Sequence, residues 1–267
     1  MDYSVICGEV CALAKEIGLY IKNEVDKIKN ENIEVKGLHD FVTYVDKNAE
    51  KKIIQRLQDI LPEAGFITEE KTISTKGELY NWVVDPLDGT TNFIHGLPCY
   101  SVSIALMREN SIVAGVVYEV NFDECFYAWE GSAAFLNGKE IEVSKREKVE
   151  DALIATGFPY YNFSDLGKYL ELFTYFLKHS HGVRRLGSAA VDLAYVACGR
   201  FEGFFEYGLN SWDVAAGSII VQQAGGKVYD FKGSNNYIFG KEIVASNGAL
   251  AEEFIGVIKD VFVPFLP

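Results

Sequence analysis

The sequence predicts a mixed α+β fold, in which helices come first, a run of strands follows, and strands then alternate with helices. Apolar residues recur every three or four positions from Ile6 to Ile28 and from Ile53 to Leu61, which is the spacing of amphipathic helices. Short β-branched and aromatic segments separated by turn residues follow between residues 101 and 144. From residue 150, helix-like and strand-like segments alternate without a linker, repeat or low-complexity stretch.

The N-terminal half is expected to contain two helices and a meander of strands. The first helix follows the apolar stripe from Ile6 to Ile28, and the second covers residues 47–61 because Pro62 ends it. A strand at residues 80–84 is expected to stop at Pro86, which has no N–H group for a ladder. Four further strands are predicted at residues 101–107, 111–120, 124–130 and 140–144, with turns at residues 109–110, 121–123 and 137–138.

The C-terminal half is expected to alternate between helices and strands. A strand is predicted at residues 201–206, and helices are predicted at residues 166–178, 188–199 and 212–224 and through Phe254, Ile258 and Val261. Gly225 and Gly226 would end the third of these helices.

Composition and charge limit the classes of protein to which this chain can belong. With 267 residues and 49% hydrophobic composition, the chain can bury a substantial core. A net charge of −13 and a pI near 4.8 argue against a nucleic-acid or anionic-membrane surface. No apolar run is long enough to cross a bilayer, and no signal-peptide pattern opens the chain, so we expect a cytoplasmic protein. The five cysteines are dispersed and odd in number, which argues against a disulfide framework.

The most informative stretch is WVVDPLDGTTNF, residues 82–93. It places Asp85 and Asp88 three residues apart, directly after a strand that reads as buried. Gly89 and Thr90 follow, so the backbone can approach an anion closely and a hydroxyl can hold a phosphate oxygen or a water molecule. This pattern suits hydrolysis assisted by a hard cation such as Mg²⁺. Taken alone, however, Asp, Pro and Gly in a row are more typical of an ordinary turn.

Further acids at the ends of predicted elements favour a metal site over an ordinary turn. Glu69 and Glu70 follow a short apolar segment, Asp213 lies in the first turn of a predicted helix, and Asp46 precedes another. Each acid has a simpler explanation, as a solvated loop, a helix-dipole partner or an N-cap. Four acidic positions at element ends in so apolar a chain nevertheless favour a metal-dependent hydrolase.

With these motifs in view, the chain resembles the inositol monophosphatase family of Mg²⁺-dependent, lithium-sensitive phosphatases. The matching segments stand in family order at residues 40–46, 67–70, 82–93, 187–190 and 212–217. The resemblance covers essentially the whole chain and implies a layered α-β-α-β-α sandwich. It also implies one compact catalytic unit, with an N-terminal α+β lobe at 1–145 carrying most metal ligands and a C-terminal α/β lobe at 146–267. The chain departs from the commonest pattern at Thr68, where the family usually has glycine.

The resemblance assigns roles to residues of both lobes. Metal ligands would be Glu69, Asp85, the carbonyl of Leu87, Asp88 and Asp213, with Asp85 bridging two Mg²⁺ ions. Catalytic residues would be Asp46 and Thr90, which orient the attacking water, together with Glu69. Contacts to the substrate would come from Gly89, Thr90, Ser188, Ala189, Glu206 and Asp213, and Glu206 would accept hydrogen bonds from substrate hydroxyls.

The implied activity is hydrolysis of a small-molecule phosphate ester, with myo-inositol monophosphate as the leading candidate substrate and a homodimer as the expected assembly. Fructose 1,6-bisphosphate, histidinol phosphate and NADP are alternative substrates within the same superfamily. A different class of function stays open, because some bacterial members resemble partners of the transcription machinery. Such a member could be a binding protein without catalysis, although the intact set of acids favours an enzyme.

Overall fold

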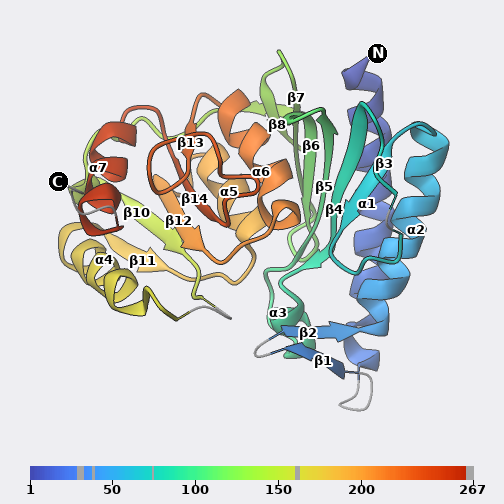
Figure 1. Ribbon diagram of the computed structural model, residues 1–267, viewed down its shortest axis with the longest axis horizontal. Helices are drawn as coiled ribbons and strands as arrows, with labels where there is room; N and C mark the ends of the chain where they lie inside the picture. The colour runs from blue at the N-terminus through green and yellow to red at the C-terminus, as the bar shows by residue number, and fades with distance from the viewer. Residues whose placement is uncertain (29–32, 38–39, 74, 160–162, 263–267) are drawn as a thin grey trace.

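Five layers stack across the molecule in the order helix, sheet, helix, sheet, helix (Figure 1). This computed structural model describes residues 1–28, 33–37, 40–73, 75–159 and 163–262. The layered α-β-α-β-α sandwich expected from the sequence is confirmed. Three apolar cores lie between the layers, and the central one lies between the two large sheets.

The outer helical layer consists of α1 (Tyr3–Glu24) and α2 (Tyr44–Ile60). Both helices bury one apolar stripe against the first sheet and leave charged residues in solvent, as the sequence pattern predicts. The prediction of one helix as far as Ile28 is wrong by one turn, because Val25–Lys27 form a 3₁₀ turn and Ile28 is extended. A small hairpin of β1 (Ile33–Gly37) and β2 (Asp40–Thr43) connects the two helices.

The first large sheet has seven strands in sequence order. All neighbours are antiparallel except the first pair, which is parallel. The strands are β3 (Gly65–Thr68), β4 (Tyr80–Asp88), β5 (Ser101–Arg108), β6 (Ser111–Glu119), β7 (Glu124–Trp129), β8 (Ala134–Leu136) and β9 (Lys139–Ile141). Strand β8 was not predicted, and the strand expected at 140–144 ends at Ile141. There the chain leaves the sheet, since the Val143 N–H bonds to the carbonyl of Ala224.

Pro86 does not end its strand. β4 continues to Asp88, and its register with β5 shifts between Asp85 and Asp88. Proline is tolerated at such an irregularity because no ladder bond is required from its nitrogen. The shift brings both aspartates to the C-terminal end of β4, followed by the short helix α3 (Thr90–Ile94).

The middle layer is formed by α5 (Ala189–Ala197) and α6 (Ser211–Gln223), which are buried on nearly all sides because a sheet covers each face. The second sheet has the order β11-β10-β12-β14-β13. Its strands are β10 (Leu153–Thr156), β11 (Gly182–Arg184), β12 (Gly203–Tyr207), β13 (Lys227–Tyr229) and β14 (Glu242–Ser246). Helices α4 (Leu166–His179) and α7 (Ala251–Phe262) cover its outer face.

The sequence argues against a membrane-crossing segment and against a disulfide framework. In the described part of the chain, no helix is both long and apolar enough to cross a membrane. All five cysteines are free thiols.

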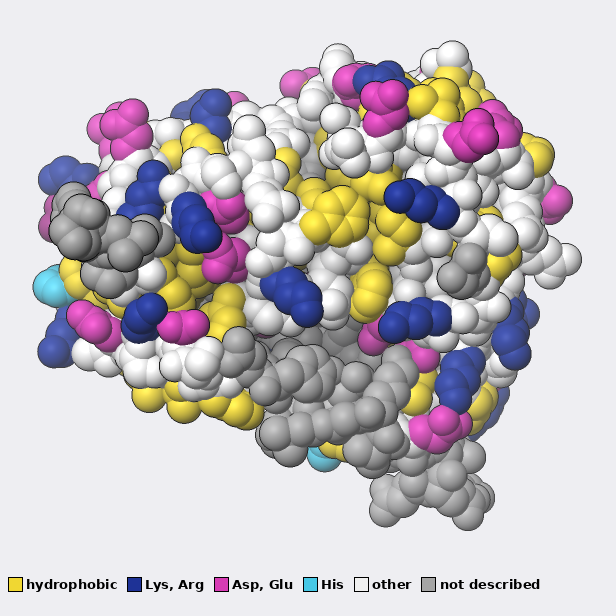
Figure 2. Space-filling model, in the orientation of Figure 1, with side chains coloured by type: hydrophobic (Ala, Val, Ile, Leu, Met, Phe, Trp, Pro, Cys, Tyr) yellow, Lys and Arg dark blue, Asp and Glu magenta, His cyan; other side chains and the backbone are white. Residues whose placement is uncertain are grey.

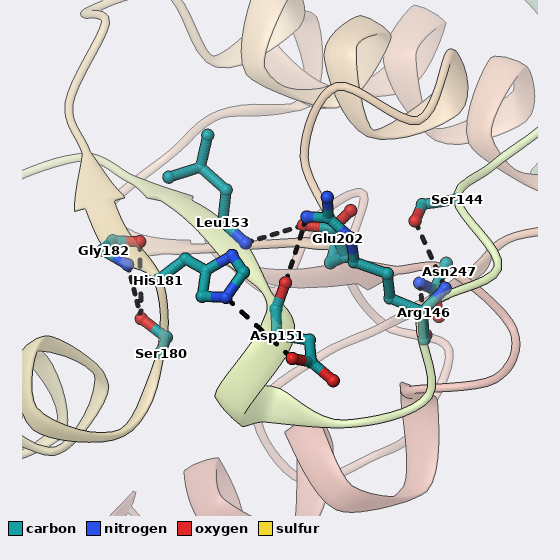
Figure 3. Close-up of polar contacts among 9 residues, drawn as sticks. All are labelled: Ser144, Arg146, Asp151, Leu153, Ser180, His181, Gly182, Glu202 and Asn247. Atoms are coloured by element: carbon teal, nitrogen blue, oxygen red, sulfur yellow. Dashed lines mark hydrogen bonds and ion pairs between the residues drawn. The ribbon is translucent and has the colours of Figure 1, made fainter.

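A buried glutamate connects the second sheet to the segment that enters it. Glu202 is 1% exposed, and its carboxylate accepts hydrogen bonds from the Leu153 N–H at 2.6 Å and from the Arg146 guanidinium at 3.4 Å. Figure 3 shows this carboxylate between the start of β10 and the loop that carries Arg146. The carbonyl of Arg146 in turn accepts a bond from the Asn247 amide at 2.9 Å.

Glu202→Ala is expected to lower the free energy of unfolding by about 2–3 kcal/mol, because the partly buried Leu153 N–H would lose its acceptor. Glu202→Gln should cost less, since its carbonyl oxygen can still accept that bond. Thermal unfolding of the three proteins measures the difference. Equal melting temperatures for wild type and Glu202→Ala would contradict this role of Glu202.

Candidate active site

One cavity lies where the end of β4, the end of β12 and the starts of α5 and α6 meet. It is lined by residues from both halves of the sequence, including Glu69, Asp85, Asp88, Thr90 and Asp213. Apart from Asp46, every residue predicted to bind metal or substrate or to act in catalysis lines this cavity: Glu69, Asp85, Leu87, Asp88, Gly89, Thr90, Ser188, Ala189, Glu206 and Asp213. Residues far apart in the sequence are therefore brought together.

Three carboxylates converge at the centre of the cavity. Asp85, Asp88 and Asp213 each offer one oxygen, and these oxygens lie within 4.8 Å of one another. Asp85 is buried, and the other two are partly buried. Two of the three come from β4 and the third comes from the first turn of α6, so the group depends on the contact between the first sheet and α6.

Hydrogen bonds fix the orientation of each of these carboxylates. The Leu87 N–H donates to Asp85 at 2.9 Å. Asp88 accepts bonds from the Ser188 hydroxyl at 2.6 Å and from the Ala190 N–H at 2.8 Å, both at the start of α5. Asp213 accepts the Asn210 N–H at 2.7 Å, in a capping box that begins α6. The predicted placement of Asp213 in the first helical turn is confirmed.

The electrostatics of this group favour a bound cation. Burial, reinforced by the charge of Glu69, raises the pKa of Asp85 well above its usual range. Burial raises the pKa of Asp88 to about 6, and burial together with the charge of Asp88 raises the pKa of Asp213 to about 7. Mutual repulsion among acids is relieved by a divalent cation, and an all-oxygen ligand set is the one that Mg²⁺ prefers.

Glu69 stands at the end of β3, beside Asp85. Its N–H donates to the carbonyl of Val84 at 3.2 Å, which extends the pairing of β3 with β4 to the edge of the cavity. Its charge is the largest electrostatic influence on the pKa of Asp85 after burial. Glu69 is therefore placed to join the three aspartates around a cation.

Asp46 and Thr90 form a second polar group. The Thr90 hydroxyl lies 3.0 Å from the carboxylate of Asp46 and 3.0 Å from the carbonyl of Leu87. Asp46 is fully buried, and burial raises its pKa. Thr90 lines the cavity, whereas Asp46 lies behind it and reaches the cavity through this hydroxyl.

The simple alternative for Asp46, an N-cap, does not describe its position. Thr43 is the N-cap of α2, and Asp46 lies three residues later, inside the first turn. Its carboxylate accepts the Thr43 N–H at 2.8 Å and the Thr43 hydroxyl at 2.6 Å, which completes a capping box. Asp46 thus stabilises the helix start with one oxygen and contacts Thr90 with the other.

Gly89 lets the chain turn sharply between β4 and α3. Its φ of 98° lies in the left-handed region, and a Cβ atom there would come 3.0 Å from the carbonyl oxygen of Cys99. A larger residue would be strained for both reasons. Glycine therefore allows the backbone after Asp88 to line the cavity.

The other end of the cavity is suited to a polar substrate. Glu206, at the end of β12, is 5% exposed, and burial raises the pKa of its carboxyl well above the usual range. A Cβ atom at Gly157 would overlap the carboxylate of Glu206, so glycine there makes room for the acid. Ser188 and Ala189 line the same region with small side chains.

Sequence reasoning missed two charged residues of the cavity, Arg185 and Asp192. Asp192 is 1% exposed, and neither of its carboxylate oxygens has a hydrogen-bond partner among the described residues. The positive charge of Arg185 lowers the pKa of Asp88, Asp192 and Glu206 against the larger effect of burial. A signal was present, because Asp192 follows Ser188 by one helical turn and therefore shares its side of α5.

Comparison with known proteins gives a consistent result. The model of the inositol monophosphatase family matches residues 2–261. The Nus factor SuhB of Pseudomonas aeruginosa is 39% identical over 259 residues, 95% of this chain and 94% of that protein. The fructose-1,6-bisphosphatase/inositol-1-monophosphatase of Thermotoga maritima is 40% identical over 232 residues, 86% of this chain and 88% of that protein.

A solved structure shares the fold over nearly the whole chain. The crystal structure of extragenic suppressor protein suhB from Bartonella henselae has a TM-score of 0.90 at 40% identity, and the match covers 96% of this chain and 98% of that one. The chain therefore belongs to the inositol monophosphatase family of metal-dependent phosphatases.

Proposed function

We propose that this protein is a Mg²⁺-dependent phosphomonoesterase that hydrolyses a small polyol phosphate, with myo-inositol monophosphate as the first candidate. The observation that carries the proposal is the convergence of Asp85, Asp88 and Asp213 within 4.8 Å of one another at the centre of a cavity. Glu69 and the carbonyl of Leu87 would complete the ligand set. When bound, two divalent cations supply Lewis-acid stabilisation of the charge that develops on the phosphoryl group.

The roles of the protein groups follow from their placement. A water molecule beside Thr90 can donate to its hydroxyl while that hydroxyl donates to the carboxylate of Asp46, which lies 3.0 Å away. The raised pKa of Asp46 makes it a better proton acceptor than an exposed aspartate. The N–H groups of Gly89 and Thr90 would bind phosphate oxygens, since they lie at the turn that opens into the cavity. Asp213, which lines the same cavity, would also contact the substrate.

Glu206 gives the proposed polyol selectivity. A carboxylate can accept hydrogen bonds from two adjacent hydroxyl groups, which distinguishes a polyol from an apolar leaving group. Ser188 and Ala189 leave space beside it for a ring. Fructose 1,6-bisphosphate, histidinol phosphate and NADP stay as alternative substrates, and inhibition by lithium and a homodimeric assembly are part of the same proposal.

A phosphate-release assay with purified protein and Mg²⁺ tests the proposal. The esters are myo-inositol monophosphate, fructose 1,6-bisphosphate, histidinol phosphate, NADP and p-nitrophenyl phosphate. The highest kcat/KM is expected for inositol monophosphate. Preference for another ester would change the proposed substrate but not the proposed reaction.

A binding role in transcription is the second candidate, because one relative carries the name Nus factor. It predicts that none of these esters releases phosphate at any Mg²⁺ concentration. The net charge of −13 opposes a direct nucleic-acid contact. On the face in Figure 2, the Lys and Arg side chains of the described residues are scattered among acidic ones and form no continuous basic stripe. Such a role would therefore act through protein partners.

Glu206→Gln is expected to lower kcat/KM for inositol monophosphate about 10- to 100-fold relative to p-nitrophenyl phosphate, because a hydroxyl bond to a charged acceptor is lost. The ratio of the two kcat/KM values isolates this contact, since both substrates share the phosphate and the metals. Glu202→Gln, a buried acid outside the cavity, is the matched control and should keep the wild-type ratio. An unchanged ratio in Glu206→Gln would remove this residue from substrate selection.

A further inference from the structure

A buried acid outside the cavity holds the segment that carries Glu69. Glu50, in the second turn of α2, is fully buried. One of its oxygens accepts the Thr72 N–H at 2.8 Å, the Thr72 hydroxyl at 2.7 Å and the Thr68 hydroxyl at 3.0 Å. The other accepts the N–H of Glu70 at 2.8 Å. All four donors belong to residues 68–72, which we call the Glu69 segment.

The Glu69 segment is therefore held from two sides. On one side the Glu69 N–H bonds to the carbonyl of Val84 on β4, which carries Asp85 and Asp88. On the other side Glu50 binds the residues immediately before and after Glu69. Residues 69–73 belong to no helix or strand, and these contacts help to fix where Glu69 stands.

The same helix also positions the other polar group of the site. Asp46 and Glu50 are four residues apart on α2 and so lie on one face, one turn apart. Asp46 contacts Thr90, and Glu50 binds the Glu69 segment. The first two turns of α2 thus connect two parts of the cavity that are separated in the sequence.

From this arrangement we infer that Glu50 is a positioning residue for metal binding, an inference that rests on the proposed function. A cation that binds a loose segment must offset the conformational entropy of ordering it, whereas a segment already in place binds without that cost. Glu50 orders the Glu69 segment in advance. Thr68 strengthens the arrangement, because glycine, the usual family residue at this position, has no hydroxyl to donate to Glu50.

Glu50→Gln tests the inference with little change in shape. An amide keeps one accepting oxygen and replaces the other with a donor, so either the Glu70 N–H or the three Thr68 and Thr72 donors lose their acceptor. The matched control is Glu119→Gln. Glu119 is also fully buried and accepts a backbone N–H, that of Phe122 at 2.6 Å, at a turn of the first sheet, and it does not line the cavity.

Calorimetric titration with Mg²⁺ and the rise in melting temperature on adding Mg²⁺ are the readouts, together with the Mg²⁺ dependence of p-nitrophenyl phosphate hydrolysis. Both variants should melt below wild type without metal. Only Glu50→Gln should weaken Mg²⁺ binding, by about tenfold, with activity recovered at high Mg²⁺. If Glu50→Gln does not fold, Thr68→Val, which removes one hydroxyl, should weaken binding about threefold.

The outcomes separate this inference from the proposed function. Wild-type Mg²⁺ affinity in Glu50→Gln, or equal weakening in Glu119→Gln, would overturn the positioning role while leaving the phosphatase intact. If neither Glu50→Gln nor Thr68→Val weakens binding, the role is likewise excluded. If the wild-type protein binds no Mg²⁺, the proposed function fails first and the inference fails with it.

Discussion

Asp213→Asn and Asp88→Asn are each expected to lower turnover by about 100-fold or more and to leave the protein folded. The loss corresponds to roughly 3 kcal/mol of transition-state stabilisation. Both positions contribute an oxygen to the central group of carboxylates, and an amide there removes one negative charge from the ligand set. The fold should persist, because the amide oxygen can still accept the Asn210 N–H at position 213 or the Ala190 N–H at position 88.

In the metal-free protein, the same substitutions should maintain or raise the thermal stability. The charge of Asp88 raises the pKa of Asp213, so neutralising either one relieves repulsion. The metal-free variants should therefore melt at or above the wild-type temperature, and the rise produced by Mg²⁺ should shrink or vanish. Activity assays at saturating Mg²⁺ and thermal unfolding with and without Mg²⁺ measure both effects.

Asp230→Asn is the control for replacing a buried aspartate. Asp230 is 4% exposed and accepts backbone bonds from Lys232 and Ser234 in a turn outside the cavity, so its variant should lose stability and keep turnover. Near-normal turnover in both Asp88→Asn and Asp213→Asn would contradict the proposal that these residues bind two catalytic cations. Reduced turnover in Asp230→Asn as well would show that the loss comes from destabilisation.

Long, strongly periodic elements were predictable from sequence because their signal is local. The apolar stripes of α1, α2 and α4 each repeat over several turns, and the helix boundaries were right to within a few residues. The short strands β10, β11, β13 and β14 were missed, since segments of three to five residues show no period of their own. Their partners lie 15 or more residues away along the chain, as in the pairing of Ile154 with Gly203, and only those partners define the strand.

The proposed metal ligands could be named from the sequence for a different reason. Asp85, Asp88 and Asp213 stand at element ends within segments whose spacing resembles the family pattern, so chemistry and position could be read together. Glu50 carried no such pattern, and Asp192 carried only its spacing of one helical turn from Ser188. Each looks like one more charged residue on a helix, and only the structure places Asp192 in the cavity wall and Glu50 against the Glu69 segment. Burial of a charge is a tertiary property that the local sequence does not contain.

In the absence of metal, the protein is expected to become less stable as the pH rises from about 4 to about 7. An acid with a higher pKa in the folded state binds more protons when folded, so the folded state loses stability as protons are removed. For Asp213 the window runs from its ordinary pKa of 3.8 to about 7, and for Asp88 it ends at about 6. A rise of roughly three pKa units corresponds to about 4 kcal/mol.

Mg²⁺ should reverse this dependence. Binding requires ionised carboxylates and therefore releases protons, so the stabilisation by Mg²⁺ should grow over the same pH range. Thermal unfolding at several pH values, with Mg²⁺ and with a chelator, measures both trends, and the metal-free melting temperature should fall by about 5–10 °C. In Asp213→Asn the fall should be smaller, because this group, whose pKa is raised to about 7, no longer titrates. Two results would contradict this account of a group of like charges that a cation stabilises. One is a metal-free melting temperature that rises with pH, and the other is an equal change of melting temperature with pH in Asp213→Asn and wild type.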